Sequence, residues 1–130
     1  MIVDEDRNVL ALAGIVLVKL GYKVYKARSA NEALDLFQGK KRLDLLVTDV
    51  RLGPVDGPRL AALLKIGHPA LAVLYIGGKI SDASPLLADG KTASQGYFLH
   101  KPFLPGELAE MAGAALNPAG EQMQRSLSEM

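Results

Sequence analysis

The chain has 130 residues, of which 49% are hydrophobic and 22% charged, a length and balance that fit one folded domain and exclude a disordered chain. Its 15 basic and 14 acidic residues give a formal net charge of +1, so there is no global basic field for nucleic acid. The absence of cysteine excludes disulfides and thiolate chemistry, and no apolar run reaches the roughly 18–20 residues that a membrane span requires. We therefore expect a cytoplasmic domain that binds neither nucleic acid nor membranes.

The first half of the chain alternates short β-type segments with helical patterns. An apolar segment at residues 1–3 predicts a first strand, and the periodicity of residues 8–20 predicts a helix that is apolar on most sides. Residues 22–27 alternate in polarity, which is typical of a half-exposed strand. A capping box then predicts a second helix, because Ser29 can accept the amide of Glu32 while the Glu32 side chain reaches back.

The second half continues this alternation. Residues 43–48 and 71–76 are mostly apolar and predict two buried strands, and residues 97–99 predict a short last strand. A helix predicted at residues 58–66 begins with proline, whose fixed φ suits the first helical position. The apolar face of residues 105–116 predicts the final helix.

Two segments have weaker patterns. Residues 77–95 predict no regular element, although Leu86 and Leu87 could lie on a short helix. Residues 117–130 are mostly polar and predict a tail that is frayed or extends the last helix. The folded domain is therefore predicted over residues 1–116.

Alternation of short strands with helices has a definite consequence for the fold. It is typical of an α/β protein with a parallel sheet, right-handed crossovers and helices on both faces. In such sheets the functional groups lie at the carboxyl ends of the strands. The residues that directly follow the predicted strands are therefore the first candidates for a site.

Charged side chains collect at those strand ends. Asp4, Glu5 and Asp6 follow the first strand, Asp49 follows the third, and Lys101 follows the fifth. Clustered carboxylates repel one another, and a hard divalent cation such as Mg²⁺ relieves that repulsion. An aspartate can attack phosphorus to form an aspartyl phosphate, and a lysine complements phosphoryl oxygens as a point charge. The pattern therefore favours phosphoryl transfer, which needs positioning and charge neutralisation.

Four short motifs, in this order and spacing, resemble the receiver domain of bacterial two-component response regulators. They are Val-Asp-Glu-Asp at residues 3–6, Leu-Val-Thr-Asp-Val-Arg-Leu at residues 46–52, Asp56-Gly57, and Leu-His-Lys-Pro-Phe at residues 99–103. The resemblance covers about residues 1–116. It implies the flavodoxin-like (βα)5 receiver fold, with a five-stranded parallel sheet in the order 2-1-3-4-5 and helices on both faces.

The resemblance also implies a role for each site residue. Asp49 would be the phosphoacceptor, taking a phosphoryl group from a histidine kinase or phosphotransfer protein. Asp4, Glu5 and Asp49 would hold Mg²⁺ together with the backbone carbonyl of Arg51. Lys101 would contact the phosphoryl group, and its bond to the following proline could be cis, as in the family. The output would be a change in contacts with a downstream protein.

Two further positions concern the switch between inactive and active states. Phe98 lies where the family often has its switch aromatic, although it could be a plain core residue. Gly77 lies where the family has serine or threonine, so the usual hydroxyl contact to the phosphoryl group is missing. The Gly77 amide or Ser81 could replace that contact. Gly77 therefore favours an alternative function, a protein-interaction module that works without phosphorylation.

Several other interpretations stay open at this stage. The acids at residues 4–6 could simply complement a helix N-terminus, and Asp49 could be an ordinary turn residue. An aspartate-nucleophile phosphatase is disfavoured, because the general acid that it needs two residues after the nucleophile is replaced by Arg51. We therefore expect a signalling domain and not an enzyme. It could stand alone or belong to a larger protein such as a hybrid sensor kinase, and its last helix could support a homodimer.

Overall fold

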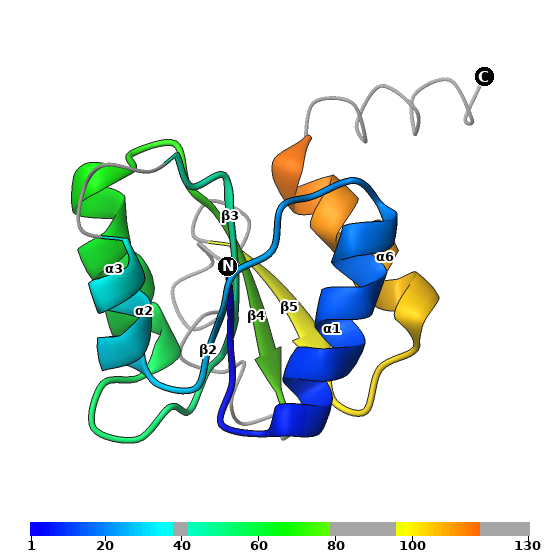
Figure 1. Ribbon diagram of the computed structural model, residues 1–130, viewed down its shortest axis with the longest axis horizontal. Helices are drawn as coiled ribbons and strands as arrows, with labels where there is room; N and C mark the ends of the chain where they lie inside the picture. Colours follow the sequence, from blue (N-terminus) through cyan, green and yellow to red (C-terminus); the bar gives the residue numbers. More distant parts are fainter. Residues whose placement is uncertain (38–41, 79–95, 118–130) are drawn as a thin grey trace.

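The structure is a computed structural model that describes residues 1–37, 42–78 and 96–117. Within these ranges five parallel strands form one sheet in the order β2-β1-β3-β4-β5 (Figure 1). The elements are β1 (Ile2–Val3), α1 (Arg7–Lys19), β2 (Lys26–Ala27), α2 (Ala30–Leu36), β3 (Leu45–Asp49), α3 (Gly57–Gly67), β4 (Ala72–Gly77), β5 (Tyr97–His100) and α6 (Pro105–Leu116). The predicted α/β class and strand order are confirmed.

Helices cover both faces of the sheet. Figure 1 shows α2 and α3 on one side and α1 and α6 on the other. Each face has its own apolar core: Leu46 and Leu60 are fully buried on the α2–α3 side, and Ile2 and Leu108 on the α1–α6 side. No helix in the described ranges is long and apolar enough to span a membrane.

Side-chain caps start three of the helices as local sequence dictates. Asp6 caps α1 by accepting the amide of Asn8, and Ser29 caps α2 by accepting the amide of Glu32 at 3.1 Å. Asp56 caps α3, so that helix begins at Gly57, one residue before the predicted start. These caps set where each strand-to-helix turn ends, and therefore where the acidic residues in those turns lie.

The second strand is shorter than residues 22–27 predicted. The Tyr22 amide donates to the Leu17 carbonyl at 3.1 Å, and Gly21 adopts a left-handed φ of 94°. This is the Schellman ending of α1, so the first part of the predicted strand belongs to a helix terminus. Pairing with β1 begins where the Ile2 amide donates to the Tyr25 carbonyl at 2.8 Å. The other predicted elements agree to within about two residues, while the suggested helix at 86–87 and most of the tail lie outside the described residues.

Candidate functional site

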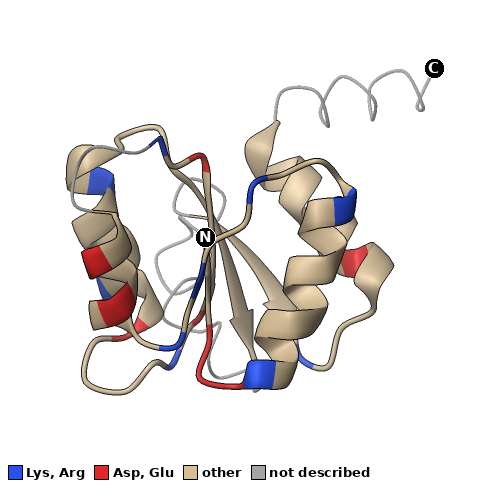
Figure 2. Ribbon diagram, viewed as in Figure 1, with Lys and Arg blue, Asp and Glu red and all other residues tan. Residues whose placement is uncertain are grey.

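The carboxyl ends of three strands bring one lysine and two acids together. Asp4 follows β1, Asp49 ends β3, and Lys101 follows β5, and the parallel register aligns these ends on one edge of the sheet. In Figure 2 the acidic segment between β1 and α1 is red at the lower edge of the sheet. The strand ends thus converge as the topology predicted.

Lys101 is the centre of this cluster. Its Nζ donates to Asp4 Oδ2 at 2.7 Å and to Asp49 Oδ2 at 3.0 Å. The Asp4 side chain is 2% exposed, whereas the side chains of Asp49 and Lys101 are 18% and 22% exposed. A carboxylate as buried as that of Asp4 needs a charged partner, and the ammonium supplies it. The more open Asp49 is the acid that an incoming group can reach.

The two acids also determine the protonation of Lys101. Desolvation by burial is the largest single influence and lowers the pKa of Lys101. The hydrogen bonds and charges of Asp4 and Asp49 together outweigh it, so the pKa rises above the ordinary value of 10.5. Lys101 therefore remains a cation throughout the physiological pH range.

The acidic residues of the loop after β1 make different contacts. Asp6 caps α1, as one interpretation of the sequence predicted, and its amide donates to Asp4 Oδ1 at 2.9 Å. The Glu5 side chain is exposed, and one of its carboxylate oxygens lies 3.6 Å from the position that a Cβ on Gly53 would take. Glu5 therefore leans toward the loop that follows β3.

A divalent cation was expected among these acids. Carboxylate oxygens are the ligands that Mg²⁺ prefers, and two carboxylates, those of Asp4 and Asp49, already share one cationic partner. The donor chemistry therefore fits a hard cation. Within the described ranges, however, no three acidic or histidine side chains lie close enough together to hold a metal ion. Glu5 does not complete such a group in this conformation.

The backbone around Asp49 is tightly packed. The Arg51 amide donates to Asp49 Oδ1 at 3.1 Å, and the Thr48 hydroxyl donates to the Asp49 carbonyl at 3.0 Å. The first residue of α3, Gly57, lies directly against that carbonyl: a Cβ there would overlap the Asp49 oxygen and stand 3.2 Å from Val50 Cα. Sequence reasoning named Gly57 only as part of a motif and missed this approach of the helix to the strand end.

The switch positions and their neighbours lie on β4 and β5. Gly77 is buried at the end of β4, and its carbonyl accepts the Lys101 amide at 2.8 Å. Phe98 is partly buried and packs against the core on the α2–α3 side. The peptide bond between Lys101 and Pro102 is cis, as the resemblance implied. Ser81, the other candidate for a phosphoryl contact, lies outside the described residues.

One contact to the acidic loop comes from a residue that sequence reasoning missed. The Arg28 side chain, directly after β2, donates to the Glu5 carbonyl through Nε at 3.4 Å and Nη2 at 3.2 Å. The signal was present, since Arg28 also follows a strand and so belongs to the same edge of the sheet. It was missed because the end of the second strand was not searched for site residues.

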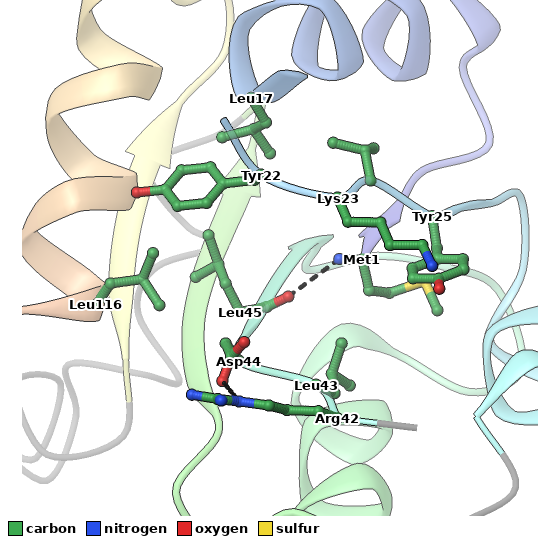
Figure 3. Close-up of a pocket in the computed structure, with 11 residues that line it drawn as sticks. Met1, Leu17, Tyr22, Lys23, Tyr25, Arg42, Leu43, Asp44, Leu45 and Leu116 are labelled. Carbon is green, nitrogen blue, oxygen red and sulfur yellow. Dashed lines mark hydrogen bonds and ion pairs between the residues drawn. The ribbon is translucent and has the colours of Figure 1, made fainter. Parts of the chain in front are cut away.

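A pocket of about 650 Å³ opens at the opposite edge of the sheet, around the amino ends of the strands (Figure 3). Apolar residues that include Leu17 and Leu116 line it together with Tyr22 and charged residues. The Met1 amine donates to the Leu45 carbonyl at 3.1 Å beside this pocket. The pocket contains none of the predicted site residues. It is therefore a separate feature from the acidic cluster.

When the Met1 amine is unblocked, its burial predicts that the stability of the fold depends on pH. Desolvation lowers its pKa from 8.0 to about 6, and the charge of Asp44 opposes this only in part. Between these values the unfolded chain binds more protons than the folded one, so stability rises with pH. From pH 6 to 8 we expect a total gain of about 2 kcal/mol in the free energy of unfolding, measured by urea denaturation. An equal slope after N-terminal acetylation would contradict this.

Comparison with known proteins agrees with this geometry. The response regulator receiver domain family matches residues 1–113. Sensor kinase CckA of Brucella abortus is 34% identical over 109 residues, which are 81% of this chain and 11% of that protein. Transcriptional regulatory protein GlrR of Escherichia coli is 32% identical over 104 residues, which are 78% of this chain and 22% of that protein. The chain thus spans less than a quarter of the length of either relative.

Solved structures share the fold. The receiver domain of NtrX from Brucella abortus is 28% identical, with a TM-score of 0.74, and the match covers 89% of this chain and 96% of that chain. Chemotaxis response regulator CheY4 of Vibrio cholerae has a TM-score of 0.75 at 24% identity and covers 88% of this chain and 95% of its own, which supports the fold alone. The matched family comprises signalling domains. The chain therefore belongs to the response regulator receiver domain family and is a receiver domain of two-component signal transduction.

Proposed function

We propose that Asp49 is the phosphoacceptor of this receiver and that it takes its phosphoryl group from a histidine kinase or phosphotransfer protein. The observation that carries the proposal is the shared Lys101 ammonium, which bonds the partly exposed Asp49 carboxylate at 3.0 Å and the buried Asp4 carboxylate at 2.7 Å. Because Asp4 is buried and already paired, Asp49 is the acid of this pair that a phosphoryl donor can approach. A cation stands where negative charge would gather on a transferred group.

Transfer of the phosphoryl group to Asp49 requires only a few groups of the protein. A carboxylate oxygen of Asp49 attacks phosphorus, and the bond from phosphorus to the donor nitrogen or oxygen breaks, with the electron pair leaving on the donor. Lys101 is positioned to neutralise the phosphoryl oxygens, and the Arg51 amide holds the second carboxylate oxygen of Asp49. Asp4, Glu5, Asp49 and the Arg51 carbonyl are the groups that would hold Mg²⁺, which supplies further charge neutralisation when bound.

The relatives support a place in a phosphorelay. One matched protein carries the name sensor kinase and another the name transcriptional regulatory protein, so this type of domain occurs within both kinds of protein. We propose that this chain exchanges its phosphoryl group in the cytoplasm and signals through altered contacts with a downstream protein.

A second candidate function rests on Gly77. This glycine has no hydroxyl to draw toward a phosphoryl group, so the usual loop movement would lack one of its contacts. The chain could then act as an interaction module that binds partners through β5 and α6 whether or not Asp49 is modified. The retained cluster of Asp4, Asp49 and Lys101 favours the first proposal, because a module of this kind does not require it.

Intact mass after incubation with acetyl phosphate and Mg²⁺ tests the first proposal. We expect a gain of one phosphoryl group, lost in Asp49→Asn and lost when EDTA removes the metal. A gain that persists in Asp49→Asn would assign another acceptor. If no gain occurs, the same measurement with a purified histidine kinase distinguishes donor preference from a true lack of phosphorylation. Failure with both donors would favour the interaction module.

A further inference from the structure

The Arg28 side chain makes a contact that extends the pairing of β1 and β2. The two strands pair through the backbone as far as the Asp4 amide, which donates to the Ala27 carbonyl at 3.1 Å. One residue further along, the Glu5 carbonyl has left the ladder, and the guanidinium of Arg28 bonds it through Nε and Nη2. At the point where β1 turns into the acidic loop, this carbonyl is therefore bonded by a side chain of the segment that follows β2.

The bonded carbonyl belongs to a peptide unit that also contacts the site. The peptide joining Glu5 to Asp6 accepts from Arg28 through its carbonyl, and its N–H donates to Asp4 Oδ1 at 2.9 Å. The other oxygen of Asp4 accepts from Lys101, which in turn donates to Asp49. A continuous series of hydrogen bonds therefore runs from Arg28 through one peptide unit and Asp4 to the Lys101 ammonium. Hydrogen bonds in such a chain polarise one another and orient the groups that they join.

We propose that Arg28 is a positioning residue for the acidic site: it holds the Glu5–Asp6 peptide so that its N–H faces Asp4 and the Glu5 side chain is directed toward the loop after Asp49. The inference rests on the proposed function for its consequence, since Glu5 and Asp4 are proposed to hold Mg²⁺. The contact itself does not depend on that function. The Arg28 guanidinium bonds the Glu5 backbone carbonyl, and within the described residues no hydrogen bond or ion pair joins it to the carboxylates of Asp4 or Glu5.

The direction of the effect distinguishes positioning from simple charge. As a cation near a cation site, Arg28 would weaken Mg²⁺ binding by repulsion, so its removal would tighten binding. As a positioning residue it would order the ligands, so its removal would weaken binding. Arg28 is exposed, and its charge is largely screened by solvent and salt. We therefore expect positioning to dominate and the Arg28→Ala variant to bind Mg²⁺ more weakly.

The experiment compares Arg28→Ala with the wild-type chain by hydrogen exchange and by Mg²⁺ titration, both followed in ¹H–¹⁵N spectra. Without metal, we expect protection of the Asp6 amide to fall about tenfold, while amides in the centre of β3 stay protected. With metal, we expect the dissociation constant for Mg²⁺ to rise about tenfold. Arg28→Lys keeps the charge and one donor, so it should recover part of both changes.

Arg7→Ala is the matched control, because it removes the same charge two residues after Glu5, and within the described ranges the Arg7 side chain makes no hydrogen bond or ion pair. It should leave the Asp6 amide protected. Unchanged Asp6 protection in Arg28→Ala would overturn the positioning role whatever happens with Mg²⁺, and so would tighter Mg²⁺ binding. A wild-type chain that binds no Mg²⁺ would instead count against the proposed function, while the exchange measurement would still decide the role of Arg28.

Discussion

Replacement of Gly57 by alanine is expected to lower the free energy of unfolding by about 3 kcal/mol. This is a large effect for a substitution that adds one methyl group and removes no contact. The added methyl would overlap the Asp49 carbonyl oxygen and press on the backbone of Val50. Backbone atoms inside a buried strand end cannot move aside as the tip of a flexible side chain can. Either α3 must shift away from the sheet or the strand end must deform. Urea denaturation measures the loss.

Gly106→Ala is a close control for Gly57→Ala. Both glycines lie in the first turn of a helix that has a proline within its first two residues, but a Cβ on Gly106 would have no neighbour within 4 Å. We expect Gly106→Ala to change the free energy of unfolding by less than about 1 kcal/mol. Equal effects of the two substitutions would mean that helix propensity, and not the contact with Asp49, explains the result. Because the overlap falls on Asp49 itself, the folded fraction of Gly57→Ala should also be phosphorylated more slowly.

The second large effect is expected for Lys101→Met. This substitution keeps much of the side-chain volume but leaves the buried Asp4 carboxylate and the nearby Asp49 carboxylate without their shared cation. Removing one member of a buried charged cluster is strongly destabilising, and the partial exposure of Asp49 moderates the cost. We expect the free energy of unfolding at pH 7 to fall by about 2–3 kcal/mol. Lys19→Met removes a lysine at the exposed end of α1 and should cost less than about 1 kcal/mol.

Acid, or removal of the charge of Asp4, should reduce the cost of Lys101→Met. Without the ammonium, the two neighbouring carboxylates would repel each other, and burial would penalise the charge on Asp4. The penalty is then present at neutral pH and disappears as the pH falls and the acids take up protons. The double variant Asp4→Asn, Lys101→Met should be more stable than Lys101→Met alone. An undiminished loss at pH 4.5 and in the double variant would show that packing, and not charge, explains the effect.

Local sequence signals predicted most elements, and the exceptions have physical causes. The helix at Pro105–Leu116 was predicted at its observed bounds, because proline starts it and its apolar face is regular. Residues 22–27 were predicted as one strand since they alternate in polarity, but the hydrogen bonds that end α1 use the beginning of this segment. Alternation shows which side chains face the core and does not show which backbone amides a preceding helix uses.

The candidate site divides in a similar way. Asp4, Asp49 and Lys101 could be brought together from sequence because each follows a strand and parallel strands end on the same edge. Glu5 was expected beside them, yet its side chain leans toward Gly53, a rotameric choice that spacing does not determine. The roles of Arg28 and Gly57 depend on contacts to backbone carbonyls of other elements. Such contacts appear only when the helices and strands are packed.

The contacts of Lys101 with residues of two other strand ends determine the stage of folding at which the site forms. Its two ion pairs join residues that are 97 and 52 positions apart along the chain, and β5, which carries it, joins the sheet only through β4. Contacts between such distant residues require closure of long loops and form late in folding. A nascent or half-unfolded chain can therefore contain Asp49 without the neighbouring cation. Under the proposed function, only molecules that have completed the sheet would then be able to accept a phosphoryl group on Asp49.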